Sequence, residues 1–102
     1  MNGTDKALNL LGLAQRSGKL ASGEFQTEKA VKDGRCALVI IAADASENTK
    51  KKFQNMCAFH HVRVLVLFGK DELGRRIGRS ERSSLAIVDD GFAKAFLKEF
   101  EA

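Results

Sequence analysis

One uninterrupted apolar segment, Cys36-Ala-Leu-Val-Ile-Ile-Ala-Ala43, limits the possible folds more than any other part of the chain. An apolar run rich in β-branched residues is typical of a strand that is covered on both faces. Arg63 to Phe68 predicts a second buried strand, Leu85 to Val88 predicts a third, and Lys19 to Ala21 forms a shorter extended piece. Buried strands need helices on both sides of the sheet, so the rest of the chain must supply two covering layers.

Helical segments alternate with these strands. In the last one, Phe92, Phe96 and Phe100 recur every four residues, which predicts a core-facing stripe. The alternation of five helices with four strands predicts an α/β fold with helices on both faces of one sheet. The expected helix limits are Thr4 or Asp5 to Gly18, Gly23 to Gly34, Ser46 onward, Gly69 to Gly78, and Asp89 or Asp90 onward.

Composition narrows the class of protein. We expect residues 1–102 to form a single domain, and the formal net charge of +4 favours an anionic partner without proving one. Cys36 and Cys57 do not make a disulfide framework and are expected as small core residues in a reducing compartment. The first apolar run, residues 7–14, is a poor signal peptide and is too short to cross a bilayer. We therefore expect a cytoplasmic protein without a membrane partner.

The stretch from Ser22 to Gly34 has the signals of a helix that presents its N-terminal end to a ligand. Gly23 is an acceptable N-cap, Gln26 is placed to reach back to the cap backbone, and Gly34 is expected to end the helix. Free N–H groups at a helix start attract anions. An anionic partner is therefore expected at this end of the helix.

Helical spacing divides the same stretch into two sides. Phe25, Lys29 and Lys32 fall on the solvent side, where an aromatic ring between two lysines suits a nucleic acid. The alternative is that Phe25 folds back as a staple-like apolar contact and that the lysines form an ordinary solvated face. The side expected to be buried comprises Thr27, Ala30, Val31 and Gly34.

A second basic stretch runs from Gly74 to Ser84 and holds four arginines between Arg75 and Arg82, against one acid. Arginine forks suit phosphate oxygens and guanine edges, and the flanking glycines and serines let backbone N–H groups approach a ligand. The alternative is a mobile solvated loop. We favour contact with a partner because the helix at Gly23 supplies another basic element. Arg16 and Lys19, which flank the end of the first helix, are further candidates for phosphate contact.

Acidic residues near the strand ends do not form a catalytic set. They stand where helix N-termini favour negative charge, so we interpret them as capping residues rather than as acid–base groups. We find no nucleophile with a credible base, and we expect neither an enzyme nor a cofactor. The acids in question are Asp44, Glu47, Asp71 and Glu72.

No metal or nucleotide motif is complete. Cys57, His60 and His61 resemble metal ligands only faintly, because adjacent histidines after a helix are poor geometry for one ion. Gly18-Lys19 lacks the remaining residues of a phosphate-binding loop. We therefore expect no metal.

Short motifs across nearly the whole chain resemble one known family. They are Leu11-Gly-Leu-Ala-Gln-Arg16, Ser22-Gly-Glu24, Lys29, Ala37-Leu-Val-Ile-Ile-Ala42, Asp44-Ala-Ser46, Asn48-Thr-Lys50, Leu73-Gly74, Ile77-Gly78 and Asp90-Gly-Phe-Ala93. Together they resemble the kink-turn RNA-binding ribosomal proteins, the L-seven-Ae and L-thirty-e superfamily, and within it the small bacterial YlxQ-type members. The resemblance implies a three-layer α-β-α sandwich around a four-stranded mixed sheet. It also implies binding to a kink-turn, a bent RNA helix with tandem sheared G·A pairs.

The resemblance also implies roles for particular residues. In the family, the helix that starts at the glycine enters the widened groove, and its first turn contacts the guanines. A lysine on the next turn contacts phosphate and base edges, and a loop near the last strand covers an extruded nucleotide. The loop role falls on Gly78 to Leu85, and the helix roles fall on Gly23, Phe25, Gln26 and Lys29.

Phe25 departs from the family pattern, and Glu24 places an unfavourable charge at the expected interface. The family usually has Asn or Lys where this chain has Phe25, and a phenyl ring cannot hydrogen-bond a guanine edge, although it could stack on a base. Glu24 would face phosphates unfavourably unless it is turned away or paired.

These arguments lead to a non-catalytic RNA-binding protein that recognises a kink-turn or similar structured RNA, with the ribosome as one candidate location. The alternative is a protein-interaction module on the same scaffold, with Phe25 as its anchor. A small enzyme acting on a phosphorylated molecule is disfavoured, and a monomer is expected because the sequence has no obvious dimer seam. The expected RNA-binding residues are Gly23, Glu24, Phe25, Gln26, Lys29, Lys32, Arg16, Lys19, Gly78, Arg79, Ser80, Arg82 and Leu85.

Overall fold

The computed structural model describes residues 3–101, and its helices and strands alternate as the sequence predicts. The α/β class is therefore confirmed. The helices are α1 (Gly3–Arg16), α2 (Glu24–Lys32), α3 (Glu47–His60), α4 (Lys70–Arg76) and α5 (Asp90–Glu101). The strands are β1 (Leu20–Ser22), β2 (Leu38–Ile41), β3 (Arg63–Val66) and β4 (Ser84–Ile87).

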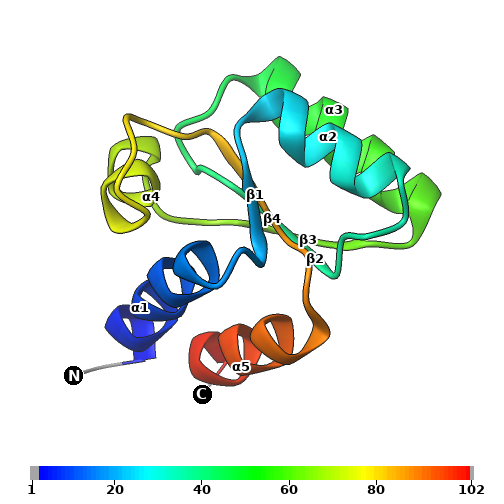
Figure 1. Cartoon of the computed structure of the whole chain (residues 1–102). Helices are drawn as coiled ribbons and strands as arrows, with labels where there is room; N and C mark the ends of the chain where they lie inside the picture. Colours follow the sequence, from blue (N-terminus) through cyan, green and yellow to red (C-terminus); the bar gives the residue numbers. More distant parts are fainter. Residues whose placement is uncertain (1–2, 102) are drawn as a thin grey trace.

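The strands form one mixed sheet in the order β1-β4-β2-β3. β2 and β3 are parallel, whereas β4 is antiparallel to both β1 and β2. Figure 1 shows α2 and α3 on one side of the sheet, α1 and α5 on the other, and α4 next to α1. The three-layer α-β-α sandwich with a four-stranded mixed sheet is therefore confirmed.

The two central strands explain the apolar runs. Every residue of β2 and β4 is buried, because these strands are paired on both edges and covered on both faces. Phe53 of α3 and Phe96 of α5 are fully buried in the two covering layers. Cys57 is fully buried and Cys36 is half-buried, and burial raises the pKa of both thiols to about 11. Both are therefore core residues with little thiolate at neutral pH.

The prediction of a second buried strand from Arg63 to Phe68 is wrong. β3 is an edge strand that ends at Val66, with Arg63 and Val66 exposed at its two ends. Its apolar sequence resembles that of a buried strand because Val64 and Leu65 pack against the core, although both are only partly buried. After β3 the chain turns sharply at Phe68, whose φ is +64°.

Some helix ends also differ from expectation. Thr4 and Asp5 lie inside the first turn of α1 instead of capping it. Ser46 caps α3 as predicted, with its Oγ accepting the N–H of Thr49 at 3.1 Å. Asp89 caps α5 by accepting the N–H of Phe92 at 2.9 Å.

The phenylalanine stripe of α5 is only partly in the core. Phe96 is fully buried and Phe92 is half-buried, but Phe100 lies in the last turn and is 39% exposed. The rings of Phe96 and Phe100 stack with centroids 6.2 Å apart, so the stripe still forms one apolar row. Among residues 3–101, no helix is long and apolar enough to cross a membrane.

Candidate nucleic-acid interface

One end of the sheet collects the starts of three helices. β1, β2 and β3 all finish at the end where β4 begins, and they lead into α2, α3 and α4 respectively. The positive ends of three helix dipoles therefore gather here, and at the start of α2 no side chain caps the backbone N–H groups, which favours an anion. The loop predicted from Gly78 to Leu85 ends earlier, because β4 already begins at Ser84. The segment from Gly78 to Ser84 enters β4 at this same end, so the structure brings the two basic stretches of the sequence together.

Gly23 fixes the direction in which α2 leaves the sheet. Its φ of +93° lies in a region that favours glycine, and its N–H donates to the carbonyl of Ser84 at 3.0 Å. The prediction that Gln26 caps this N–H is therefore wrong, and the exposed Gln26 side chain is left for other contacts. The carbonyl of Gly23 accepts the N–H of Thr27, which starts the helix.

The inner side of α2 packs as predicted, with one exception. Thr27, Ala30 and Val31 are buried, but Gly34 is exposed because the helix ends at Lys32 and Gly34 turns the chain away with a φ of +74°. The Oγ1 of Thr27 is fully buried and has no hydrogen-bond partner among the described residues.

The loop from Gly78 to Ser84 is tied down, which argues against a mobile loop. Arg82 Nε donates to Ser22 Oγ at 3.3 Å, and Arg82 Nη1 donates to Ser80 Oγ at 3.0 Å. The backbone N–H of Arg82 donates to the carbonyl of Lys70 at 3.0 Å. Arg82 is therefore a bridge between β1, the loop and the start of α4.

A close backbone contact holds the same loop against α4. A Cβ at Gly74 would lie 2.0 Å from the carbonyl oxygen of Ser80, so only glycine allows this approach. The backbone N–H of Arg79 also donates to the carbonyl of Gly74 at 2.8 Å. Gly78 turns the chain at a φ of +72°, and Arg79 and Ser80 are left exposed at the tip.

The outer face of α2 carries the exposed aromatic ring. Phe25 is 74% exposed, so the alternative in which it folds back as an apolar staple is wrong. Lys29 pairs with Asp33 at 3.1 Å and Lys32 pairs with Glu28 at 2.9 Å, and both lysines remain more than half exposed. Exposed pairs of this kind are weak and can exchange their partner for a phosphate. With Phe25 these four residues line a shallow hollow on the surface.

The acids of α2 are neutralised from the neighbouring helix. Lys52 of α3 pairs with Glu24 at 3.1 Å and with Glu28 at 2.7 Å. Hydrogen bonds from Lys52 and Lys32 lower the pKa of Glu28 to about 2. Glu24 is therefore paired, which removes the repulsion of phosphate that its position suggested.

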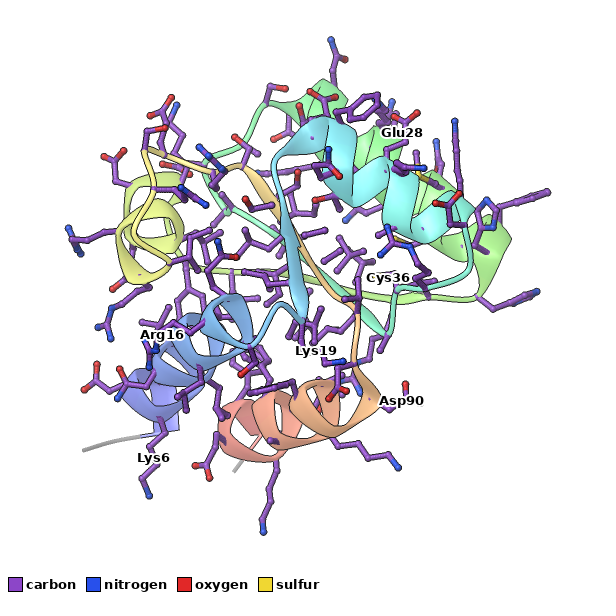
Figure 2. All side chains as sticks on the ribbon, viewed as in Figure 1. Lys6, Arg16, Lys19, Glu28, Cys36 and Asp90 are labelled. Carbon is purple, nitrogen blue, oxygen red and sulfur yellow. The ribbon has the colours of Figure 1, made fainter. Side chains whose placement is uncertain are left out.

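Three of the predicted RNA-binding residues lie neither on the exposed surface of α2 nor in the loop from Gly78 to Ser84. Leu85 is fully buried in β4, so its side chain is not accessible to a ligand. The prediction that the Leu85 side chain contacts RNA is therefore wrong. Lys19 lies at the other end of β1 from Gly23, where its carbonyl accepts the N–H of Val88. Arg16 ends α1, and Figure 2 shows Arg16 and Lys19 well away from Glu28 on α2. Contacts from Arg16 and Lys19 to RNA stay predictions.

The acidic residues near the strand ends serve helix starts, as predicted. Asp44 Oδ1 accepts the N–H of Lys70 at 2.9 Å and so caps α4. Glu47, Asp71 and Glu72 lie in the first turns of α3 and α4. Within residues 3–101, no group of three or more His, Cys, Asp or Glu side chains could hold a metal ion.

Comparisons with known proteins support this assignment of the fold. The sequence model of the ribosomal protein L7Ae/L30e/S12e/Gadd45 family matches residues 5–97 of this chain. The chain belongs to this family. A relative from Enterococcus faecium, named RNA-binding protein YlxQ, is 44% identical over 87% of this chain and 85% of its own length. The resemblance predicted from sequence motifs is therefore confirmed.

Two solved structures share the fold. A protein of unknown function from Bacillus halodurans C has a TM-score of 0.90 and 39% identity, and the match covers 95% of this chain and 98% of that one. The 15.5kD RNA binding protein of Giardia lamblia has a TM-score of 0.80 and 23% identity, over 97% of this chain and 85% of that one. The second likeness concerns the fold alone.

Sequence reasoning missed two residues that shape the interface. Lys52 was one of three consecutive lysines, and no local pattern distinguishes it from Lys51 or predicts a contact with Glu24, 28 residues earlier. Ser22 gave no sign that it accepts from Arg82, 60 residues later. Both contacts depend on how the layers pack, which only the fold supplies.

Proposed function

We propose that this protein binds a kink-turn or a similarly bent structured RNA, without catalysis, through the start of α2 and the loop from Gly78 to Ser84. The observation that carries the proposal is the direct link between the two elements. Arg82 bonds to Ser22, and Gly23 bonds to Ser84, so one RNA could touch the helix start and the loop together. The RNA-binding relative of the same family supports the choice of ligand.

The proposed division of labour follows from exposure and charge. Phe25 stacks on a base, a contact worth roughly 1–3 kcal/mol per base in other proteins. Gln26 and the free N–H groups of the first turn of α2 reach base edges or phosphates. Lys29, Lys32 and Arg79 neutralise phosphates, which releases counterions and makes binding salt-dependent.

A titration against a short kink-turn RNA tests the proposal. The control RNA has Watson–Crick pairs in place of the tandem G·A pairs, and both are measured at two salt concentrations. Tight binding to the kink-turn and weak binding to the control is the expected result. Equal affinity for both with a steep salt dependence would instead indicate a general RNA binder.

The same experiment distinguishes RNA binding from the alternative of a protein-interaction module. Phe25 could also anchor a protein, but the named relative supports RNA binding. Absence of binding to either RNA, together with capture of a protein partner from an RNase-treated extract, would overturn the RNA-binding proposal. Binding in the cytoplasm as a monomer, with a ribosomal RNA as one candidate target, belongs to the same proposal.

A further inference from the structure

Two carboxylates stand where an RNA-binding surface would be expected to carry none. Glu24 and Glu28 lie in the first two turns of α2, next to Phe25 and Lys29. A phosphate close to either carboxylate would be repelled, and like charges across an interface oppose binding. Some feature of the fold must therefore remove this repulsion if α2 is to bind RNA.

Lys52 provides this feature from a different helix. Its ammonium lies 3.1 Å from Glu24 and 2.7 Å from Glu28, and 5.7 Å from the centroid of the Phe53 ring. Lys52 is thus held between both acids and above a fully buried aromatic ring. Both of its carboxylate contacts point toward α2, and this leaves the ammonium with less capacity for a phosphate.

We propose that Lys52 is a positioning residue of the RNA interface, which pairs with Glu24 and Glu28 to neutralise them and which does not contact RNA itself. This inference rests on the proposed RNA-binding function. It distinguishes the lysines of the surface by their partners. Lys29 pairs with neither Glu24 nor Glu28, Lys32 pairs with Glu28 alone from the outer face of α2, and Lys52 pairs with both acids from α3. It also gives α3 a supporting role at the interface, a role that the sequence did not suggest for this helix.

A double-mutant cycle with the kink-turn RNA as probe tests the proposal. Lys52→Met is expected to weaken binding about threefold to fivefold, because Glu24 loses its ion pair and Glu28 keeps only the one with Lys32. In a Glu24→Gln, Glu28→Gln background, the same Lys52→Met change is expected to alter affinity by less than about twofold. Lys52→Arg, which keeps the charge, is expected to restore most of the affinity. Thermal unfolding of each variant checks that the fold is retained.

Lys51→Met is the matched control. Lys51 is the preceding residue of α3, is exposed, and has no ion pair in the described part of the chain. Its loss is expected to leave affinity unchanged within about twofold. Lys52 would be a direct phosphate contact, and the inference would be overturned, if Lys52→Met weakened binding equally in both backgrounds. An unchanged affinity in the Lys52→Met single variant would also overturn it.

These outcomes remain distinct from failure of the proposed function. If the unmodified protein bound neither the kink-turn nor the control RNA, the RNA-binding proposal would fall and this inference with it. If the unmodified protein bound the kink-turn but Lys52→Met had no effect, the function would stand and only the role of Lys52 would fall.

Discussion

Arg82 donates from Nε to the Oγ of Ser22 at 3.3 Å, and this bond joins residues 60 positions apart in the chain. The same guanidinium donates to Ser80 and to the carbonyl of Glu81. Arg82 was expected from the sequence as a phosphate contact. In the structure the guanidinium makes hydrogen bonds within the protein, and these bonds hold the loop against β1, the strand that leads into α2.

This bridge predicts that Arg82→Lys is not a conservative change. Lysine keeps the charge but cannot make the several directed bonds of the guanidinium. We expect the variant to bind kink-turn RNA more weakly and to exchange the amide hydrogens of residues 78–84 faster. Lys70→Arg serves as the control, since it keeps a charge beside the same loop. Protection of the loop that matched the unmodified protein would contradict the bridging role.

Lys29 is expected to contribute far more to RNA binding than Lys98. Lys29 lies on the outer face of α2, whereas Lys98 is in the last turn of α5 in the opposite layer. Each phosphate contact adds about 0.9 to the slope of log affinity against log salt. Lys29→Ala should therefore weaken binding and reduce that slope, and Lys98→Ala should do neither. Equal effects of the two changes in a salt titration would refute the assignment of the interface.

Gly74→Ala should destabilise the protein and release the loop. The added Cβ would meet the Ser80 carbonyl oxygen at 2.0 Å, so the backbone of the loop has to move. We expect a loss of about 1–3 kcal/mol in the free energy of unfolding, measured by urea denaturation. Gly69→Ala is the control, because a Cβ there finds only Asp44 Oδ2, at 3.8 Å. Similar losses for the two variants would mean that the close contact is not decisive.

Thr27→Val is expected to leave stability unchanged or to raise it by up to about 1 kcal/mol. The buried Thr27 hydroxyl makes no hydrogen bond among residues 3–101, so valine removes an unpaired polar group and keeps the shape of the side chain. Thr49→Val is the control and should lower stability, because the Thr49 hydroxyl is bonded to Ser46 Oγ at 3.0 Å. Chemical denaturation of both variants gives the comparison.

The pKa of Glu28 provides a test that needs no RNA. Hydrogen bonds from Lys52 and Lys32 lower this pKa from 4.5 to about 2, so the ion pairs stabilise the fold at neutral pH. Because the pKa is depressed in the folded state, the stabilisation is present above pH 4.5 and is lost as the pH falls from 4.5 toward 2. Carboxyl NMR titration should show a midpoint near 2 that rises in Lys52→Met. A midpoint that did not move in this variant would show that Lys52 does not pair with Glu28 in solution.

The sequence predicts the fold well because its strongest signals are local. The continuous apolar run identifies β2, and the capping residue Ser46 marks α3, and both signals need only neighbouring residues. β3 was misjudged because an edge strand and a central strand can have the same apolar composition. The two kinds of strand differ in how many neighbouring strands pair with them. The strand order β1-β4-β2-β3 cannot be predicted from the sequence of any single segment.

The candidate interface is less predictable for the same reason. Its two halves, at Gly23 and at Gly78 to Ser84, were found from local charge and turn residues. The exposure of Phe25 followed from helical spacing and is confirmed at 74%. The pairing of Glu24 with Lys52, the burial of Leu85 and the distant position of Lys19 all depend on packing between elements.

The exposure of Phe25 also separates the demands of folding from those of binding at this position. Its ring is 74% exposed at the start of α2 and does not belong to the buried core, so the side chain at position 25 can be exchanged at little cost in folding free energy. Under the proposed function, the identity of residue 25 is therefore set by the ligand and not by the demands of folding.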